Sequence, residues 1–188
     1  MNKLLLAIPD RCTGCSRCVY ACSAEKEGRF IPSQGRIHIS QFSLEGYSVP
    51  HICFQCSNPG CLPACPAGAI YRNGQNVLLV DEEKCSGCGD CVDACPYGMI
   101  QQDPRGLAYK CDSCGGDPAC VKECYPRAIV FEEGDEDLHR LRNLQLEAVG
   151  NGASPEEKRH GLGLKILAEA RGRRGAISSP TGPPENKP

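Results

Sequence analysis

Residues Cys85–Pro96 read Cys-Ser-Gly-Cys-Gly-Asp-Cys-Val-Asp-Ala-Cys-Pro. Three cysteines stand at steps of three, a fourth follows four residues later, and a proline comes directly after it. Thiolates this close together can surround a cube of iron and sulfide. A zinc site is typically built from two short Cys-x-x-Cys pairs with a longer spacer between them. The stretch therefore predicts a [4Fe-4S] cluster.

This spacing resembles the motif of bacterial-type ferredoxins, in which the first three cysteines bind one cube and the fourth binds a second cube nearby. The resemblance predicts further cysteine groups, and the chain contains three more. In chain order the groups are Cys12, Cys15, Cys18 and Cys22; Cys53, Cys56, Cys61 and Cys65; Cys85, Cys88, Cys91 and Cys95; and Cys111, Cys114, Cys120 and Cys124. They use all 16 cysteines, the number that four [4Fe-4S] clusters require.

The ferredoxin resemblance also implies which cysteines share a cluster. If each fourth cysteine serves a neighbouring cluster, the groups act in twos, and the adjacent second and third groups together resemble a small bacterial ferredoxin. The first group is then left to pair with the fourth, which wraps the start of the chain against its later part. The implied ligand sets are Cys53, Cys56, Cys61 with Cys95; Cys85, Cys88, Cys91 with Cys65; Cys12, Cys15, Cys18 with Cys124; and Cys111, Cys114, Cys120 with Cys22.

A short internal repeat follows three of the groups. Residues Pro66–Ile70 match Pro96–Ile100, and Pro126–Ile129 is a shortened copy. In each copy the proline redirects the chain after the outgoing cysteine, and the isoleucine can pack beneath a cluster.

A second repeated feature lies inside the groups, directly before the second cysteine. Gly14 and Gly87 hold this position in the first and third groups. A glycine there lets the backbone approach the cube and point amide hydrogens at its sulfurs. Gln55 and Ser113 hold it in the other two groups, so we expect their loops to differ.

Composition and charge indicate the compartment and the partner. The 188 residues include no tryptophan and only 5% aromatic side chains, so metal must help to hold the fold together. Residues 1–9 are too short and too poorly charged for a secretion signal, no twin-arginine pair precedes them, and no apolar run approaches the roughly 20 residues of a membrane span. We therefore expect a reducing cytoplasm, where clustered thiols bind metal.

Electrostatics point to a protein partner. The formal net charge is −2 with every cysteine neutral, and each oxidised cube with four thiolates adds about −2. The core should therefore be anionic, and the surface that it docks onto basic. The arginines at 171, 173 and 174 are too few to predict nucleic-acid binding.

The pattern predicts an α+β fold of two pseudo-symmetric bacterial ferredoxin-like modules with a C-terminal helical extension. Strands are expected over Lys3–Ile8, Arg36–Ser40 and Val77–Val80, and a helix over Val19–Lys26. We divide the chain into a polyferredoxin domain over residues 1–131, a helical extension over 132–170 and a flexible tail over 171–188.

The extension suggests either an interface or a folded-back segment. Leu138, Leu141 and Leu144 approximate one face of a helix, and Ser154-Pro155 opens a second one that Gly161 and Gly163 weaken. These helices could dock onto a catalytic subunit or a second copy of this chain. The alternative is that they pack on their own domain.

Residues 3–131 as a whole resemble the electron-transfer subunits of molybdenum and tungsten oxidoreductases, the dimethyl-sulfoxide-reductase iron–sulfur subunit family. Glu27–Pro32 with Arg36-Ile37, and Lys110–Pro118, are similar to the cytoplasmic branch that serves tungsten aldehyde oxidoreductases and carbon monoxide dehydrogenases. The resemblance implies a large catalytic partner, with the tungsten aldehyde oxidoreductase favoured.

The predicted role is electron transfer without catalysis. The chain has no glycine-rich phosphate loop, pterin signature or paired catalytic carboxylates, and a cube with four cysteine ligands offers no open iron site. Three alternatives stay open: a free polyferredoxin carrier, the electron-transfer subunit of a carbon monoxide dehydrogenase or hydrogenase, and a structural or oxygen-sensing iron–sulfur module.

Several residues near the groups have two interpretations. Arg11, Lys84 and Lys110 each precede the first cysteine of a group, where their charge could raise a cluster potential or steer docking, or where they could simply be solvated. Three tyrosines are expected to pack over clusters, and the histidines share no ligand spacing and are expected at the surface or in loops. These are Tyr20, Tyr97 and Tyr125, and His38, His51, His139 and His160.

Overall fold

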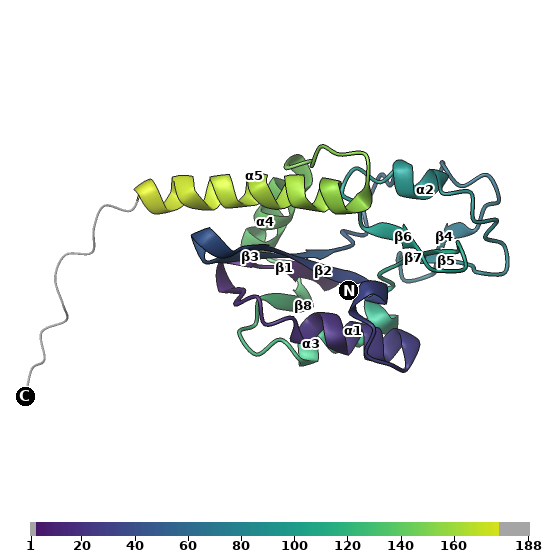
Figure 1. The fold of residues 1–188 in the computed structure, drawn as a ribbon, viewed down its shortest axis with the longest axis horizontal. Helices are drawn as coiled ribbons and strands as arrows, with labels where there is room; N and C mark the ends of the chain where they lie inside the picture. The colour runs from purple at the N-terminus through teal and green to yellow at the C-terminus, as the bar shows by residue number, and fades with distance from the viewer. Residues whose placement is uncertain (1–2, 177–188) are drawn as a thin grey trace, which may run out of the picture.

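Four antiparallel strand pairs carry the cysteine loops in the computed structural model, which describes residues 3–176 (Figure 1). Two-stranded sheets are marginally stable alone, so these pairs depend on the helices and clusters around them. The pairs are β1 (Lys3–Ala7) with β8 (Ile129–Glu133), β2 (Ile37–Phe42) with β3 (Tyr47–Ile52), β4 (Ile70–Arg72) with β5 (Leu78–Val80), and β6 (Ile100–Gln102) with β7 (Ala108–Lys110).

The strand pairs form two modules, one inserted into the other. In the outer module β1 pairs with β8, from Lys3 opposite Glu133 to Ala7 opposite Ile129. There α1 (Arg17–Glu27), which ends at the left-handed Gly28, packs against α3 (Ala119–Lys122). The inner module holds the pairs β4–β5 and β6–β7 with α2 (Asp90–Asp93). The start of the chain is thus wrapped against its later part, and the α+β expectation is confirmed.

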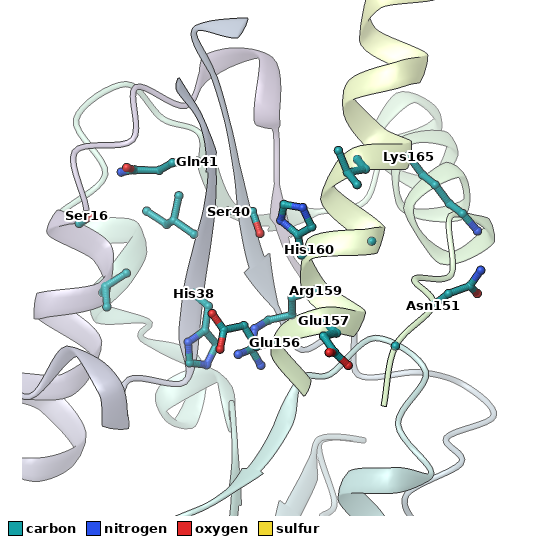
Figure 2. A pocket seen from close by; sticks show the side chains of 15 residues that line it. Ser16, His38, Ser40, Gln41, Asn151, Glu156, Glu157, Arg159, His160 and Lys165 are labelled. Atoms are coloured by element: carbon teal, nitrogen blue, oxygen red, sulfur yellow. The ribbon is translucent and has the colours of Figure 1, made fainter. Parts of the chain in front are cut away.

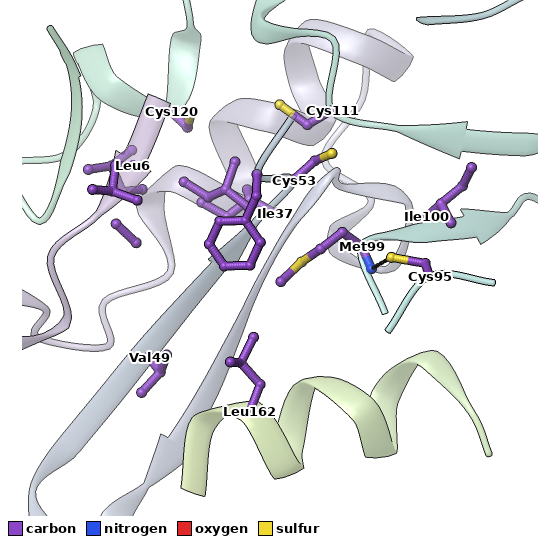
Figure 3. Close-up of a cluster of buried hydrophobic side chains, with 14 of the residues drawn as sticks. Leu6, Ile37, Val49, Cys53, Cys95, Met99, Ile100, Cys111, Cys120 and Leu162 are labelled. Carbon is purple, nitrogen blue, oxygen red and sulfur yellow. Dashed lines mark hydrogen bonds between the residues drawn. The ribbon is translucent and has the colours of Figure 1, made fainter. Parts of the chain in front are cut away.

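The hairpin β2–β3 lies at the centre of the fold. All six residues of β3 are buried, and this strand contacts both β1 and α5. Leu6, Ile37, Ile100 and Leu162 point from four different elements into the same core, which also contains cysteines of all four groups (Figure 3). Short 3-10 turns complete the structure at Pro9–Arg11, Pro32–Gln34, Ser43–Glu45 and Ser113–Gly116.

Two helices form the C-terminal extension. The Asp135 side chain accepts a hydrogen bond from the Leu138 amide at the start of α4 (Glu136–Glu147). At the start of α5 (Pro155–Ala176), Ser154 and Glu157 exchange side-chain and backbone hydrogen bonds in a capping box.

The boundaries differ from those expected. Strand β8 runs two residues past 131, because it follows β1 to the end of their pairing. Helix α5 continues to Ala176, into the stretch expected as a tail. The rest of that stretch, residues 177–188, lies outside the described residues.

Helix α5 lies along the central hairpin of its own chain (Figure 1). It buries Leu162, Ile166 and Leu167 there. A methyl group on Gly163 would stand only 3.0 Å from the Phe42 ring, so the glycine that weakened the helix prediction permits close packing. Of the two alternatives for the extension, the folded-back one holds for this helix, and self-association stays a prediction. Within residues 3–176, none of the helices combines the length and apolar character that a membrane crossing requires.

A matched pair of glycine substitutions tests this seating. Gly68 and Gly98 hold the same position of the internal repeat with φ of +61° and +65°. A methyl group on Gly68 meets nothing within 4 Å, whereas one on Gly98 would overlap the Pro155 carbonyl at the start of α5. We expect G68A to lower the free energy of unfolding by the backbone strain alone, about 1–2 kcal/mol, and G98A by clearly more. Anaerobic denaturant titration measures both, and equal losses would contradict the packing of α5 on this loop.

Candidate metal centres

Cysteines from different groups meet around three hollows. In each hollow, three thiols come from one group and the fourth comes from another. The hollows are lined by Cys53, Cys56, Cys61 and Cys95; by Cys12, Cys15, Cys18 and Cys124; and by Cys111, Cys114, Cys120 and Cys22.

The remaining four cysteines form a fourth cluster of thiols. Burial, and after it the neighbouring charges of Cys65, Cys85 and Cys88, raise the pKa of Cys91 to about 11. This neighbourhood again combines three cysteines of one group with the fourth cysteine of another.

The buried thiols need a strong counter-charge before they can ionise. Burial raises the pKa of Cys18 to about 12, with added contributions from Cys12, Cys124 and Cys15. Iron binds thiolates, so assembly of a cluster must release these protons. Among the described residues, no three His, Cys, Asp or Glu side chains could hold a single metal ion. Four thiols that line one hollow fit a group with four metal atoms, such as a [4Fe-4S] cube.

The internal repeat supplies a hydrogen bond to the outgoing cysteine of three groups. The amide four residues later donates to the sulfur in each copy, and the Met99–Cys95 bond is drawn in Figure 3. The bonds are Ala69 N–H to Cys65 Sγ at 3.2 Å, Met99 N–H to Cys95 Sγ at 3.4 Å and Ala128 N–H to Cys124 Sγ at 3.1 Å. Such bonds favour the more negative, reduced state of a cluster.

The loops of the four groups share more than the sequence predicts. Gln55 and Ser113 have φ of 49° and 57°, in the same left-handed region as Gly14 and Gly87. The left-handed backbone at this position is shared, but the loop of the fourth group differs as expected, because Cys114 has a positive φ of 48° as well. The second group has glutamine in place of glycine because the Gln55 side chain is used: its amide donates to the Cys111 carbonyl at 2.8 Å, and its oxygen accepts from the Leu78 amide at 2.8 Å.

Charge interactions and the chain itself order the four thiol sets into a row, in which the set of Cys88 is joined to the set of Cys53 along the chain, through Cys91 and Cys95. Cys53 of the inner module lies close enough to Cys111 of the outer module to raise its pKa, after the larger effect of burial. Cys18 acts on Cys120 in the same way within the outer module. Cys15 and Cys88, in the sets at the two ends of this row, are the exposed cysteines of the described chain.

The three cations that precede cysteine groups differ in environment. Arg11 is exposed, and Lys84 is exposed and paired with Asp81 at 2.8 Å. These two are solvated residues. Lys110 is different, because only 6% of it is exposed. The solvated interpretation is therefore wrong for Lys110.

The three tyrosines also differ. Tyr97 packs edge-on against Phe54 with ring centroids 5.0 Å apart and lines the hollow of Cys53, as expected. Tyr125 is 90% exposed and Tyr20 46% exposed, so neither covers a cluster. The expectation is wrong for these two residues.

One histidine is buried and a second is half-buried, against expectation. His38 and His51 face each other across the β2–β3 pair, and burial lowers the pKa of each to about 3. The His51 ring contacts the Ser40 hydroxyl at 2.9 Å. Beside them, a groove between β2 and α5 is lined by His38, Arg159 and other polar side chains (Figure 2). It contains no cysteine, so it is separate from the cluster sites.

Two cations of α5 reach the loop of the third cysteine group. Lys158 Nζ donates to the Asp93 carbonyl at 2.9 Å, and Arg159 Nη1 donates to the Gly98 carbonyl at 2.5 Å. Both side chains are buried. No sequence pattern distinguishes them from the other charges of the extension, because their role depends on where α5 is seated.

Two family models match the chain. A 4Fe-4S dicluster domain matches residues 44–134, which include the second, third and fourth groups, and a 4Fe-4S binding domain matches residues 9–25, which include the first. Both descriptions agree with the hollows lined by four thiols. The chain carries four [4Fe-4S] clusters.

Three relatives match this chain over most of their own length. The polyferredoxin-like subunit of an aliphatic sulfonate oxidoreductase from Pyrococcus furiosus is 41% identical over 124 residues, 64% of this chain and 70% of its own. A ferredoxin from Methanocaldococcus jannaschii is 34% identical over 91% of this chain and 97% of its own. The B subunit of anaerobic dimethyl sulfoxide reductase from Escherichia coli is 34% identical over 74% of this chain and 77% of its own.

The chain belongs to the ferredoxin-like iron–sulfur subunits of the dimethyl-sulfoxide-reductase family, which are non-catalytic electron-transfer subunits of oxidoreductase complexes.

Proposed function

We propose that this subunit passes electrons, one at a time, through its four clusters between a tungsten aldehyde oxidoreductase and an acceptor in the cytoplasm. The observation that carries the proposal is the row of four thiol sets with an exposed cysteine, Cys15 or Cys88, in each end set. Clusters in a row with one accessible thiol at each end suit entry of an electron at one end and exit at the other.

The proposal includes an assignment of ligands by crossover. By inner clusters we mean the two in the middle of the row, of which the second belongs to the outer module. They are those of Cys53, Cys56, Cys61 with Cys95 and of Cys111, Cys114, Cys120 with Cys22. The outer clusters are those of Cys85, Cys88, Cys91 with Cys65 and of Cys12, Cys15, Cys18 with Cys124. The grouping of the thiols around shared hollows supports the assignment.

The aldehyde oxidoreductase is favoured by the stretches Glu27–Pro32 and Lys110–Pro118. Both stretches lie at the outer module or at its junction with the inner one. In the first of them Glu27 pairs with Arg36, whose amide donates to Cys22 Sγ at 3.2 Å. In the second, Asp112 pairs with Lys26 at 2.7 Å. Both stretches therefore surround the cluster of Cys111, Cys114, Cys120 and Cys22. Their support for the aldehyde oxidoreductase as partner comes from the sequence resemblance.

A sulfonate oxidoreductase is the second candidate partner. It is favoured by the Pyrococcus relative, which is named as a subunit of an aliphatic sulfonate oxidoreductase. The two candidates place the same electron-transfer chemistry in this subunit and differ only in the substrate oxidised by the catalytic chain.

Anaerobic co-purification tests the partner. We expect a tagged chain to elute with a larger chain that contains tungsten, and an aldehyde to reduce the clusters of this complex. Reduction by an aliphatic sulfonate alone would favour the second candidate. Nickel in the large chain would point to carbon monoxide dehydrogenase, and elution without any partner would contradict a bound subunit and favour a free carrier.

A further inference from the structure

Lys110 is a buried cation without a carboxylate partner. Its ammonium donates to the Leu78 carbonyl at 2.6 Å and to the Cys111 carbonyl at 2.9 Å. Within residues 3–176 no aspartate or glutamate forms an ion pair with it. A buried charge is costly unless an opposite charge compensates it. The compensating charge must therefore come from something other than a carboxylate.

The position of Lys110 identifies that compensating charge. Its side chain lines the hollow of the second group, together with Cys53 and Cys61. Its backbone is joined directly to Cys111, a proposed ligand of the other inner cluster. The ammonium thus lies where the two modules meet, beside both inner clusters. A [4Fe-4S] cube with four thiolates is an anion, and its charge grows when it takes up an electron.

Gln55 forms neutral hydrogen bonds at the same junction between the modules. Its side chain binds Cys111 and Leu78, the residues that also bind the ammonium of Lys110. The junction therefore has two parts: a neutral amide that fixes the loops and a cation that acts on the clusters. Lys84 offers the contrast, because it also precedes a cysteine group but its side chain is 63% exposed and paired with Asp81. Solvent and Asp81 screen its charge.

We propose that the positive charge of Lys110 acts on both inner clusters and makes both of them easier to reduce. This inference rests on the proposed ligand assignment. The junction between the modules then assists electron transfer, because an electron is stabilised by the same cation before and after it crosses from one module to the other.

The test replaces the charge but keeps the hydrogen bonds. Lys110→Gln retains amide donors for the two carbonyls, Lys110→Arg retains the charge, and Lys84→Gln is the matched control. Each purified subunit is titrated anaerobically with a reductant, and the four one-electron steps are followed by electron paramagnetic resonance. In K110Q we expect two steps to become at least tenfold less favourable, which is about 59 mV for a one-electron couple. The other two steps should not move, and K84Q and K110R should stay close to wild type.

The outcomes separate this inference from the proposed function. Wild-type protein that lacks four one-electron steps would contradict the function itself. Four steps in the wild type that stay unmoved in K110Q would overturn the inference alone, as would equal shifts in K110Q and K110R. If K110Q loses the inner clusters and K110R keeps them, the shared charge is supported. Loss in both variants overturns it, because the junction then requires the shape of lysine and not its charge.

Discussion

Replacing Cys95 by alanine is expected to remove the cluster of the second group while leaving the cluster of the third group in place. Cys95 belongs to the third group by sequence, but its thiol lines the hollow of Cys53 and Cys61. The variant should lose up to four of about sixteen iron atoms. Anaerobic alkylation with mass spectrometry identifies the released thiols, and we expect Cys53 and Cys61 among them.

Cys65→Ala is the reciprocal control. Cys65 belongs to the second group, but its neighbours are Cys85, Cys88 and Cys91. This variant should release those three thiols and protect Cys53. If each substitution instead released the cysteines of its own group, each group would bind its own cluster and the crossover would be wrong.

Leu162→Ala is expected to lower the free energy of unfolding by about 2–5 kcal/mol, the usual cost of removing a large buried aliphatic side chain. Leu162 is fully buried and points from α5 into the core beside the central hairpin (Figure 3). The substitution leaves a cavity between α5 and the rest of the fold. Anaerobic denaturant titration of the cluster-loaded protein measures the loss.

Leu164, two residues along the same helix, provides the matched control. Its side chain is 47% exposed, so Leu164→Ala should change the free energy of unfolding by no more than about 0.5 kcal/mol. Both residues are leucines of α5, but Leu162 lies on the buried face of the helix and Leu164 on the exposed face. Equal effects of the two substitutions would mean that α5 is not seated on the hairpin in solution.

The cysteine arrangement could be predicted because it depends on short spacings and on one resemblance. The distances between cysteines within a group are set over a few residues, and the glycine-containing loops repeat. The strands Lys3–Ala7 and Leu78–Val80 and the helix ending at Gly28 were also predictable, because each has a local apolar pattern or a stop signal. The contact between the start of the chain and its later part, seen as the pairing of β1 with β8, followed from the sharing of cysteines between the first and fourth groups. The sequences of the two strands did not predict it.

Other elements carry too little local signal to be predicted. Strands β4, β6 and β7 contain three residues each and, unlike β5 of the same length, have no run of apolar side chains. Burial of individual polar side chains is a property of distant packing. Lys84 and Lys110 hold the same place before a cysteine group, yet one faces solvent and the other lies where two modules meet. His51 is buried because α5 covers its strand, and that contact joins residues far apart in the sequence.

The C-terminal extension shows why its role was ambiguous from sequence. Its leucines predict an apolar helix face but cannot say what covers that face. In the structure the covering surface is the chain itself, through Leu162 and through the Gln145 side chain, which donates to the Ala7 carbonyl at 2.8 Å. The extension therefore reinforces the strand that leads into the first cysteine group.

The most direct test of the account is an anaerobic iron count combined with a redox titration of the same sample. We predict about sixteen iron atoms per chain, bound as four [4Fe-4S] clusters that take up four electrons in one-electron steps. A preparation with far fewer irons, or one in which the clusters accept no electrons from dithionite or from the catalytic partner, would contradict the claim that sixteen cysteines form a path for electrons.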